Sequence, residues 1–323
     1  MKIRNLMRTL AASAAVLGCV GAAAQGFPSK PIRVVVCVAP GGSGDAIGRI
    51  VGAGLGNMGQ PVVVENRPGA GGTLAGAFVA KGPADGHALL VCDPTPAVAA
   101  VAMYKQLTYD PPRDLAMVQW AAAAQFWLVT SSASGITSMK ALIEQAKANP
   151  GKISYGNSGA GTMHHLTVEL LKQRLGIDMV PVFYKGGGPS VQDVAGNQIP
   201  VVLSGPASTE GLIKSGKLRL LAVASRERSP AHPDVPAFSE FVPGFEANSP
   251  LGVWAAAGTP RDILVRLNSE LNKAVQQPAV LKQLQALGLD SMPIRDLAES
   301  DRVWREQLGV WPDLIRKLKL TAD

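Results

Sequence analysis

The chain has 323 residues, of which 47% are hydrophobic and 17% charged, and its formal charge is +7. This length and hydrophobic content suit two globular domains and exclude a disordered chain, because enough apolar surface is present to form packed cores. The Lys and Arg residues are scattered and only four Tyr are present. Nucleic acid is therefore excluded as a partner, since the sequence offers neither a basic stripe for phosphates nor a stacking surface for bases.

The first 24 residues are typical of a secretory signal peptide. Three basic residues among the first eight precede an apolar stretch from Leu10 to Val20, and Ala22–Ala24 provides the small side chains of a cleavage site. The apolar stretch is shorter than the ~20 residues that a membrane-spanning helix needs. We expect export to the periplasm, with lipid attachment at Cys19 as the less favoured alternative; cleavage would lower the formal charge from +7 to +4.

Two cysteines, Cys37 and Cys92, remain after cleavage, and each lies in an apolar run that predicts a strand. They could form a disulfide in an oxidising compartment. We favour two buried thiols that pack as small hydrophobic side chains, because a disulfide between strands requires Cβ directions that a sequence does not show.

Residues 25–124 predict the first part of an α/β fold. Short apolar runs alternate with helical patterns, as expected for βαβ units around a mostly parallel sheet. We expect strands at residues 32–38, 61–65 and 88–92 and helices at 45–57 and 73–81.

A second α/β unit begins near residue 125 and repeats this alternation. We expect strands at residues 126–129, 153–155, 179–184, 201–204 and 218–224 and helices at 138–148 and 162–175. Five prolines in residues 225–250 indicate a surface excursion, and a strand at 251–256 leads into a helical C-terminal segment. The expected division is one domain of residues 25–124 plus 251–323 and a second domain of residues 125–250.

Two glycine-rich turns each follow a predicted strand and precede a predicted helix. The first turn is Pro40–Asp45 and the second is Gly156–Thr162. Ligands of parallel sheets bind at such positions, where helix N-termini present unpaired N–H groups that stabilise a carboxylate. For either turn alone, the alternative interpretation is that its glycines only permit a tight change of chain direction. Because the same pattern occurs in both halves of the chain, we favour a cleft shared between them. Asp45 is interpreted as a helix cap or a ligand-facing acid, and Asp93 as a turn cap or a cleft residue.

The familiar catalytic motifs are incomplete. The Gly211–Lys217 segment has P-loop spacing, but Leu218 stands where a Ser or Thr would contact Mg²⁺. The segment around Ser158 resembles a nucleophile elbow, but Ala160 replaces its second glycine. Adjacent histidines at 164 and 165 diverge on a helix and do not predict a metal site, so we expect no catalytic residue, metal or cofactor.

The sequence resembles the Bug-type, TctC-like solute receptors of tripartite tricarboxylate transporters over essentially the whole mature chain. The resemblance rests on Phe27–Arg33, Ala39–Asp45, Val62–Gly72, Ala84–His87, Tyr109–Asp110, Ile153–Thr162, Tyr184–Pro189 and Ser215–Arg219. It implies a Venus-flytrap fold, a type II periplasmic binding protein of two α/β domains whose two ligand turns hold a carboxylate through backbone N–H groups and ordered waters. It also implies a noncatalytic, extracytoplasmic receptor whose partner is a membrane transporter; we further expect a monomer.

The candidate ligand-binding residues follow from the two turns and this resemblance. They are Pro40, Gly41, Gly42, Ser43, Gly44, Asp45, Asp93, Thr95, Asn157, Ser158, Gly159, Gly161, Thr162, Tyr184 and Ser204. Asp93 and Asn157 depart from the family's usual residues, and Val201–Pro206 lacks its usual acid, which favours a ligand bearing a hydroxyl, amide or aromatic group. An exported hydrolase or a ligand sensor for a membrane signalling partner remain the alternative functions.

Overall fold

The computed structural model describes residues 26–317 and 320–321, so the predicted signal peptide and Cys19 lie outside the described residues. Two sheets organise this part of the chain, one of six strands and one of five. The strands are β1 (Ile32–Val36), β2 (Val62–Asn66), β3 (Ala88–Cys92), β4 (Leu115–Gln125), β5 (Trp127–Ser131), β6 (Ser154–Asn157), β7 (Val180–Phe183), β8 (Val201–Ser204), β9 (Leu218–Val223), β10 (Asn248–Ala256) and β11 (Leu289–Ser291).

The helices connect and cover these strands. They are α2 (Ser43–Leu55), α3 (Thr73–Ala80), α4 (Ala100–Met103), α5 (Pro111–Asp114), α6 (Met139–Ala148), α7 (Met163–Leu175), α8 (Gly187–Ala195), α9 (Pro206–Lys214), α10 (Arg261–Val275), α11 (Pro278–Ala286) and α12 (Leu297–Lys317). Short helical turns are η1 (Gly56–Met58), η2 (Ala70–Gly72), η3 (Thr95–Ala99) and η4 (Phe238–Glu240).

The six-stranded sheet has the order β11-β4-β10-β3-β1-β2 and, with its helices, forms the first lobe. Successive side chains of a strand face opposite sides, so β1 contributes to two cores. Val34 and Val36 pack with Leu267 and Leu271 of α10, whereas Val35 packs on the opposite face in a cluster that includes Trp304 of α12. The sheet is therefore covered by helices on both faces, as its apolar strands require.

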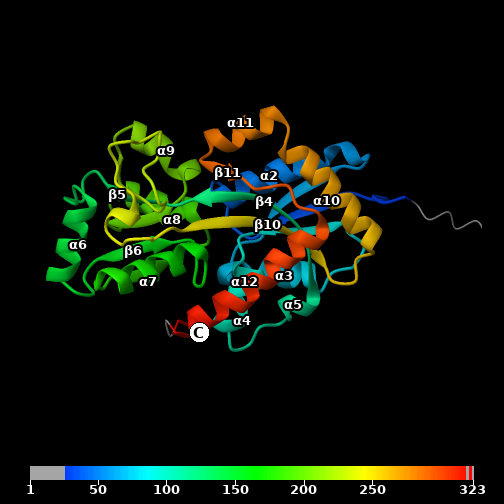
Figure 1. Ribbon diagram of the computed structural model, residues 1–323, viewed down its shortest axis with the longest axis horizontal. Helices are drawn as coiled ribbons and strands as arrows, with labels where there is room; N and C mark the ends of the chain where they lie inside the picture. The colour runs from blue at the N-terminus through cyan, green and yellow to red at the C-terminus, as the bar shows by residue number, and fades with distance from the viewer. Residues whose placement is uncertain (1–25, 318–319, 322–323) are drawn as a thin grey trace, which may run out of the picture.

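The five-stranded sheet has the order β7-β6-β8-β5-β9 and, with its helices, forms the second lobe. Leu128 and Tyr155 face a core with Leu166 of α7, and Val129 faces another with Val191 of α8. Figure 1 shows the helices of this lobe at one end of the molecule and α2, α3 and α10 at the other, with β4 and β10 running toward the second lobe.

Both sheets are mixed rather than mostly parallel. Strands β1, β2 and β3 are parallel neighbours, as are β6, β7 and β8, which is the part that the βαβ pattern predicted. Strands β4, β10 and β11 add antiparallel pairs to the first sheet, and β5 pairs antiparallel with β8 and β9 in the second. Three of these strands, β4, β5 and β10, lie where the chain crosses between the lobes.

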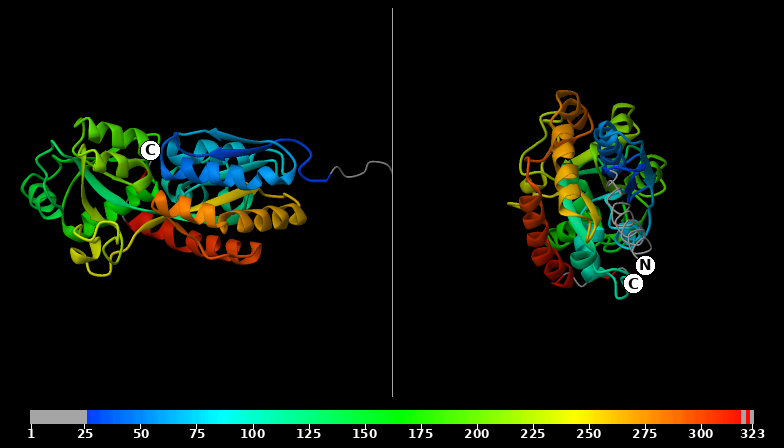
Figure 2. Two further views of the ribbon diagram at one scale, coloured as in Figure 1. Left: turned by 90° about the horizontal axis from the view of Figure 1, so that it is seen from above. Right: turned by 90° about the vertical axis from the view of Figure 1, so that its right-hand side faces the viewer.

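The two lobes are joined by two passages of the chain that lie side by side. The first passage is Phe126, between β4 and β5, and the second enters β10 at Ala247. The Ala224 N–H donates to the Phe126 carbonyl at 2.8 Å, and the Ala247 N–H donates to the Ala224 carbonyl at 2.8 Å. Figure 2 shows the molecule elongated along the axis that connects the lobes.

A disulfide joins Cys37 to Cys92, which corrects the expectation of two free thiols. Strands β1 and β3 are parallel neighbours with Val36 opposite Val91, so the two cysteines stand one residue further along in the same register. Their Cα atoms are 5.4 Å apart, a separation that suits a disulfide. The pairing depends on sheet order and register, which the sequence pattern did not provide.

Candidate ligand-binding site

Two connected hollows lie between the lobes. The smaller, of about 40 Å³, is lined by Cys37, Val38, Gly42, Ser43, Gly44, Asp93, Ala124, Ser158, His164, Gly187, Ser204, Gly205, Ser249 and Leu251. The larger, of about 310 Å³, is lined by Cys37, Val38, Gly69, Ala70, Gly71, Gly72, Asp93, Tyr104, Ser158, Gly159, Ala160, Thr162, Phe183, Tyr184 and Lys185. We call the two hollows together the cleft, and its walls come from both lobes.

Three helix N-termini meet at the smaller hollow. Helix α2 begins at Ser43 in the first lobe, whereas α8 begins at Gly187 and α9 follows Gly205 in the second. The positive ends of the helices and their unpaired N–H groups favour an anion at this point. Ser249 adds a hydroxyl that is 1% exposed and makes no hydrogen bond, so the site holds a polar atom in need of a partner.

The lobes touch directly at the first ligand turn. The Ala39 N–H donates to the Lys185 carbonyl of the second lobe at 2.9 Å. A Cβ built on Gly188 would lie 3.0 Å from the Pro40 carbonyl oxygen, and one built on Gly186 would lie 3.1 Å from the Ala39 nitrogen. Side chains larger than hydrogen would push the lobes apart here, so the glycines of the second lobe permit this close approach.

The second ligand turn carries a chain of hydroxyl groups. The Thr162 hydroxyl donates to the Gly159 carbonyl at 2.8 Å, and the Ser158 hydroxyl donates to the Thr162 oxygen at 3.2 Å. His164 Nδ1 lies 2.8 Å from Ser158 Oγ, and burial lowers the pKa of His164 to about 4. The imidazole is therefore neutral near pH 7.

Asp93 stands where the two hollows meet. Its Oδ1 accepts the Thr95 N–H at 3.0 Å, and its Oδ2 accepts the Met163 N–H at the start of α7 at 3.4 Å. Burial raises the pKa of Asp93, although the Thr95 hydroxyl and the two backbone donors oppose the shift. Thr95 bridges the lobes nearby, since its hydroxyl donates to the Gly161 carbonyl at 3.3 Å.

Asp45 holds the first turn in shape. Its carboxylate accepts the Gly41 N–H at 3.2 Å, the Asn66 amide at 3.0 Å and two donors of Arg49. Burial alone would raise the pKa of Asp45, but the hydrogen bonds from Asn66, Arg49 and Gly41 outweigh burial and lower it. With these contacts Asp45 supports the ligand turn from the first turn of α2. The N-cap of α2 is Gly42 and the helix has no side-chain cap, so the interpretation of Asp45 as the capping residue is wrong.

Most of the predicted site residues line the cleft. They are Gly42, Ser43, Gly44, Asp93, Ser158, Gly159, Thr162, Tyr184 and Ser204. The Tyr184 hydroxyl already donates a hydrogen bond to Asp193 at 2.6 Å, so Tyr184 contributes its ring to the lining. Six others are absent from the lining and stand behind or beside it: Pro40, Gly41, Asp45, Thr95, Asn157 and Gly161.

The structure also brings residues to the cleft that the sequence analysis missed. They are Val38, Gly69–Gly72, Tyr104, His164, Lys185, Gly187, Gly205, Ser249 and neighbouring apolar residues. The Gly186–Gly188 run carried the same signal as the two named turns, a glycine-rich link from a strand into a helix. Ser249 carried no such signal, because it enters the cleft from β10, far along the chain.

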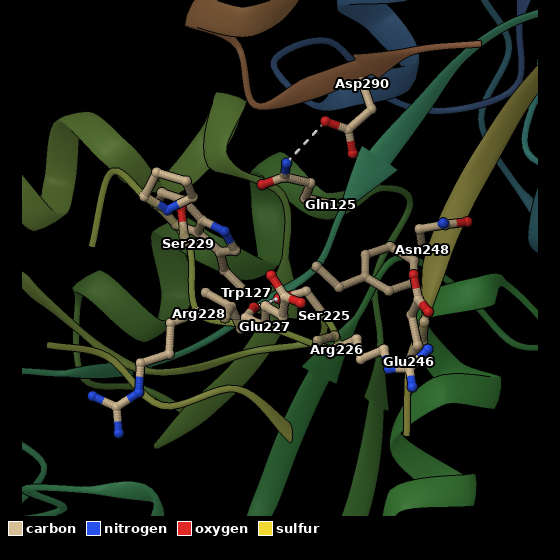
Figure 3. Close-up of a pocket in the computed structure, with 15 residues that line it drawn as sticks. Gln125, Trp127, Ser225, Arg226, Glu227, Arg228, Ser229, Glu246, Asn248 and Asp290 are labelled. Atoms are coloured by element: carbon tan, nitrogen blue, oxygen red, sulfur yellow. Dashed lines mark hydrogen bonds between the residues drawn. The ribbon is translucent and has the colours of Figure 1, made fainter. Parts of the chain in front are cut away.

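A separate hollow of about 360 Å³ lies beside the two passages between the lobes, outside the cleft. Figure 3 shows its polar walls, with Gln125 directed at Asp290, to which its amide donates at 3.0 Å. Arg226, Arg228 and Glu246 belong to the surface excursion after β9 and the turn into β10. The lining contains no glycine, so it lacks the backbone approach that the cleft provides.

No group of three or more His, Cys, Asp or Glu side chains within residues 26–317 is arranged to hold a metal ion. Among the helices of the described chain, none combines the length and the apolar character needed to span a bilayer.

The family model for the tripartite tricarboxylate transporter family receptor matches residues 47–320. The chain belongs to this receptor family. BugT of Bordetella pertussis is 33% identical over 323 residues, which cover 97% of this chain and 98% of BugT. The UPF0065 protein of the tcbD-tcbE intergenic region of Pseudomonas sp. (strain P51) is 36% identical over 300 residues, 92% of this chain and 89% of that protein.

Solved structures share the whole architecture. A periplasmic transporter protein aligns with a TM-score of 0.86 at 34% identity, covering 92% of this chain and 100% of that one. The R. palustris protein Rpa4515, solved with adipate, has a TM-score of 0.86 at 28% identity (91% and 99% covered), and MatC from Rhodopseudomonas palustris, solved with malate, has 0.83 at 29% (90% and 100%). These likenesses confirm the predicted two-domain periplasmic binding fold and the receptor family, which is not a class of enzymes.

Proposed function

We propose that this protein is an extracytoplasmic receptor that captures a small organic carboxylate in the cleft and delivers it to a tripartite transporter in the membrane. The observation that carries the proposal is the meeting of three helix N-termini from both lobes beside the unpartnered hydroxyl of Ser249. Such a site stabilises a carboxylate without a dedicated basic side chain. Relatives solved with adipate and malate support the same ligand class.

We further propose that the two lobes close around the ligand as domains. Residues 25–124 and 251–323 form one domain and residues 125–250 the other, and they rotate about the passages near residues 124 and 250. The strands of each sheet fall on the corresponding sides of these boundaries apart from the ends of β4 and β10 at the crossovers, which supports the division. The mature protein is exported to the periplasm, acts as a monomer and uses no cofactor.

A melting-shift experiment on the mature chain tests the proposal. The panel holds succinate, adipate, malate, citrate and benzoate with their hydroxy and amino derivatives, and uncharged amides of the same skeletons are the matched controls. At a ligand concentration 100 times its Kd, a specific ligand raises the free energy of unfolding by about 2.7 kcal/mol. For a protein of this size, this gain raises the melting temperature by about 5–10 °C. If no carboxylate shifts the midpoint more than its amide does, the receptor proposal is wrong.

The contact between Ser158 and His164 is the one observation that favours a hydrolase. A general base works best with a pKa near the operating pH, whereas burial lowers the pKa of His164 to about 4. Ser158 Oγ also lies within 3.2 Å of the Thr162 oxygen, so the imidazole competes with Thr162 for its proton. We therefore propose that the chain has no catalytic role; ester turnover by the wild type that disappears in Ser158→Ala would contradict this.

A further inference from the structure

We propose that Asp93 is a specificity residue that selects carboxylate ligands carrying a hydrogen-bond donor, an ammonium or a hydroxyl group, at the position that faces it. The inference rests on the proposed receptor function and narrows its ligand class. It follows from the place of Asp93 in the cleft, from the groups that already contact its carboxylate and from the anion site beside it.

Asp93 lines both hollows of the cleft, a position that it shares with Cys37, Val38 and Ser158. It follows β3 directly, and the disulfide at Cys92 fixes the end of that strand to β1. A ligand that extends from the smaller hollow into the larger one must therefore pass its carboxylate.

In the described chain no cationic side chain is seen to form a hydrogen bond with the Asp93 carboxylate. Its contacts are the Thr95 hydroxyl and the backbone N–H groups of Thr95 and Met163, all of them uncharged. His164, in the same hollow, is half-buried and neutral near pH 7, and Lys185 is the cationic side chain among the residues that line the two hollows. A half-buried carboxylate in this position is stabilised by any further donor that reaches it.

Asp93 also occupies the anion-binding end of α7. Because its Oδ2 accepts the Met163 N–H from across the cleft, a ligand carboxylate placed there would meet a like charge. The smaller hollow offers the alternative, with the N-termini of α2, α8 and α9 and the unpartnered Ser249 hydroxyl. A ligand whose carboxylate binds at that end presents its adjacent carbon atoms to Asp93, where a donor group gains a charge-assisted hydrogen bond.

The test compares ligands that differ only in that donor. Isothermal titration of the mature, disulfide-bonded protein measures Kd for succinate, malate and aspartate; for glutarate, 2-hydroxyglutarate and glutamate; for adipate, 2-hydroxyadipate and 2-aminoadipate; for tricarballylate and citrate; and for benzoate with its 2-hydroxy and 2-amino derivatives. In every set that binds, we expect a donor-bearing member to bind at least tenfold more tightly than the unsubstituted acid, as a hydrogen bond to a charged group provides. A tighter ammonium member and a tighter hydroxyl member both support selection by a donor.

Two variants assign the preference to Asp93. Asp93→Asn keeps the shape and removes the charge, Asp93→Ser shortens the side chain, and we expect either to reduce the preference to threefold or less. Asp290 lines the separate hollow beside the two passages, outside the cleft. The control variant Asp290→Asn removes this carboxylate and should leave the preference unchanged. Equal Kd values within the sets that bind, or a preference that persists in both Asp93 variants, would overturn the inference; binding in no set would instead overturn the proposed receptor function.

Discussion

Two serines in the described chain bury hydroxyl groups that make no hydrogen bond, and they stand in different surroundings. Ser249 is 1% exposed and faces the cleft, whereas Ser300 is fully buried on α12 in the first lobe. An unsatisfied buried hydroxyl lowers stability, since its desolvation is not compensated. A ligand in the cleft can provide the missing hydrogen-bond partner of Ser249. Ser300 lies outside the cleft and has no such role.

The pair provides a matched test of the anion site. We expect Ser249→Ala to raise the free energy of unfolding by about 1 kcal/mol and to weaken carboxylate binding about tenfold, because one hydrogen bond to a charged group is lost. Ser300→Ala should give a similar gain in stability with unchanged affinity. Urea denaturation and isothermal titration measure the two effects; an unchanged Kd in Ser249→Ala would remove Ser249 from the site.

Sequence reasoning located side chains that belong to the two ligand turns but not those that depend on tertiary contacts. Ser43 and Ser158 follow from the pattern of strand, glycine-rich turn and helix. Ser249 is delivered by β10, which inserts between β3 and β4, and no local pattern encodes that neighbourhood. The capping interpretation of Asp45 is wrong, because its carboxylate bonds Gly41, Asn66 and Arg49, and Asn66 comes from β2, which no local pattern places beside the turn.

At the scale of elements, local pattern placed the strands around the ligand turns well. The predicted bounds of β3 and β8 agree with the structure, and α7 differs by one residue. The prediction missed β4, whose sequence includes four consecutive alanines, residues with low strand propensity. This segment is a strand because it pairs with β10 and β11, so tertiary contacts override its local preference.

The turn at Gly71 approaches the other lobe so closely that a methyl group there should hinder closure. Gly71 has φ of 58°, and a Cβ on it would lie 2.5 Å from the Ala160 carbonyl oxygen across the cleft. We expect Gly71→Ala to weaken ligand binding at least tenfold, because the added methyl group would hold the Gly71 turn and the Ala160 turn further apart than they lie in this structure. Gly135, with φ of 77° and open space around it, is the control for backbone strain alone. Both variants should lose about 1–2 kcal/mol of stability, and equal ligand Kd values in the two would contradict closure at this contact.

At the scale of the whole molecule, α12 connects the cores of both lobes. Trp304 is buried in a first-lobe cluster with Trp254, whereas Ile315, near the end of the helix, is buried with Leu128 and Tyr155 of the second lobe. The helix therefore adds a packed connection to the two passages of the chain. Its path was not predicted, because an amphipathic pattern identifies an apolar face but not the partner of that face.

This packing predicts that the C-terminal turn of α12 stabilises the molecule as a unit. Ile315→Ala should lower the free energy of unfolding by about 2–5 kcal/mol, the usual cost of truncating a fully buried aliphatic side chain. Ile294, which is 50% exposed, is the control, and Ile294→Ala should change it by no more than about 0.5 kcal/mol. Guanidinium denaturation measures both variants; equal midpoints would show that the end of α12 contributes nothing to the second core.

The disulfide between Cys37 and Cys92 has a consequence for preparing the protein. It closes a covalent ring that contains the first ligand turn, α2, β2 and α3. Material produced in a reducing cytosol would lack this ring, and the loss of a tie across 55 residues of sequence amounts to about 4 kcal/mol by chain entropy. In such a sample the first-lobe side of the cleft would be less rigid even where the fold is kept. Weak ligand binding in a titration would then reflect the reduced disulfide rather than the wrong choice of ligand.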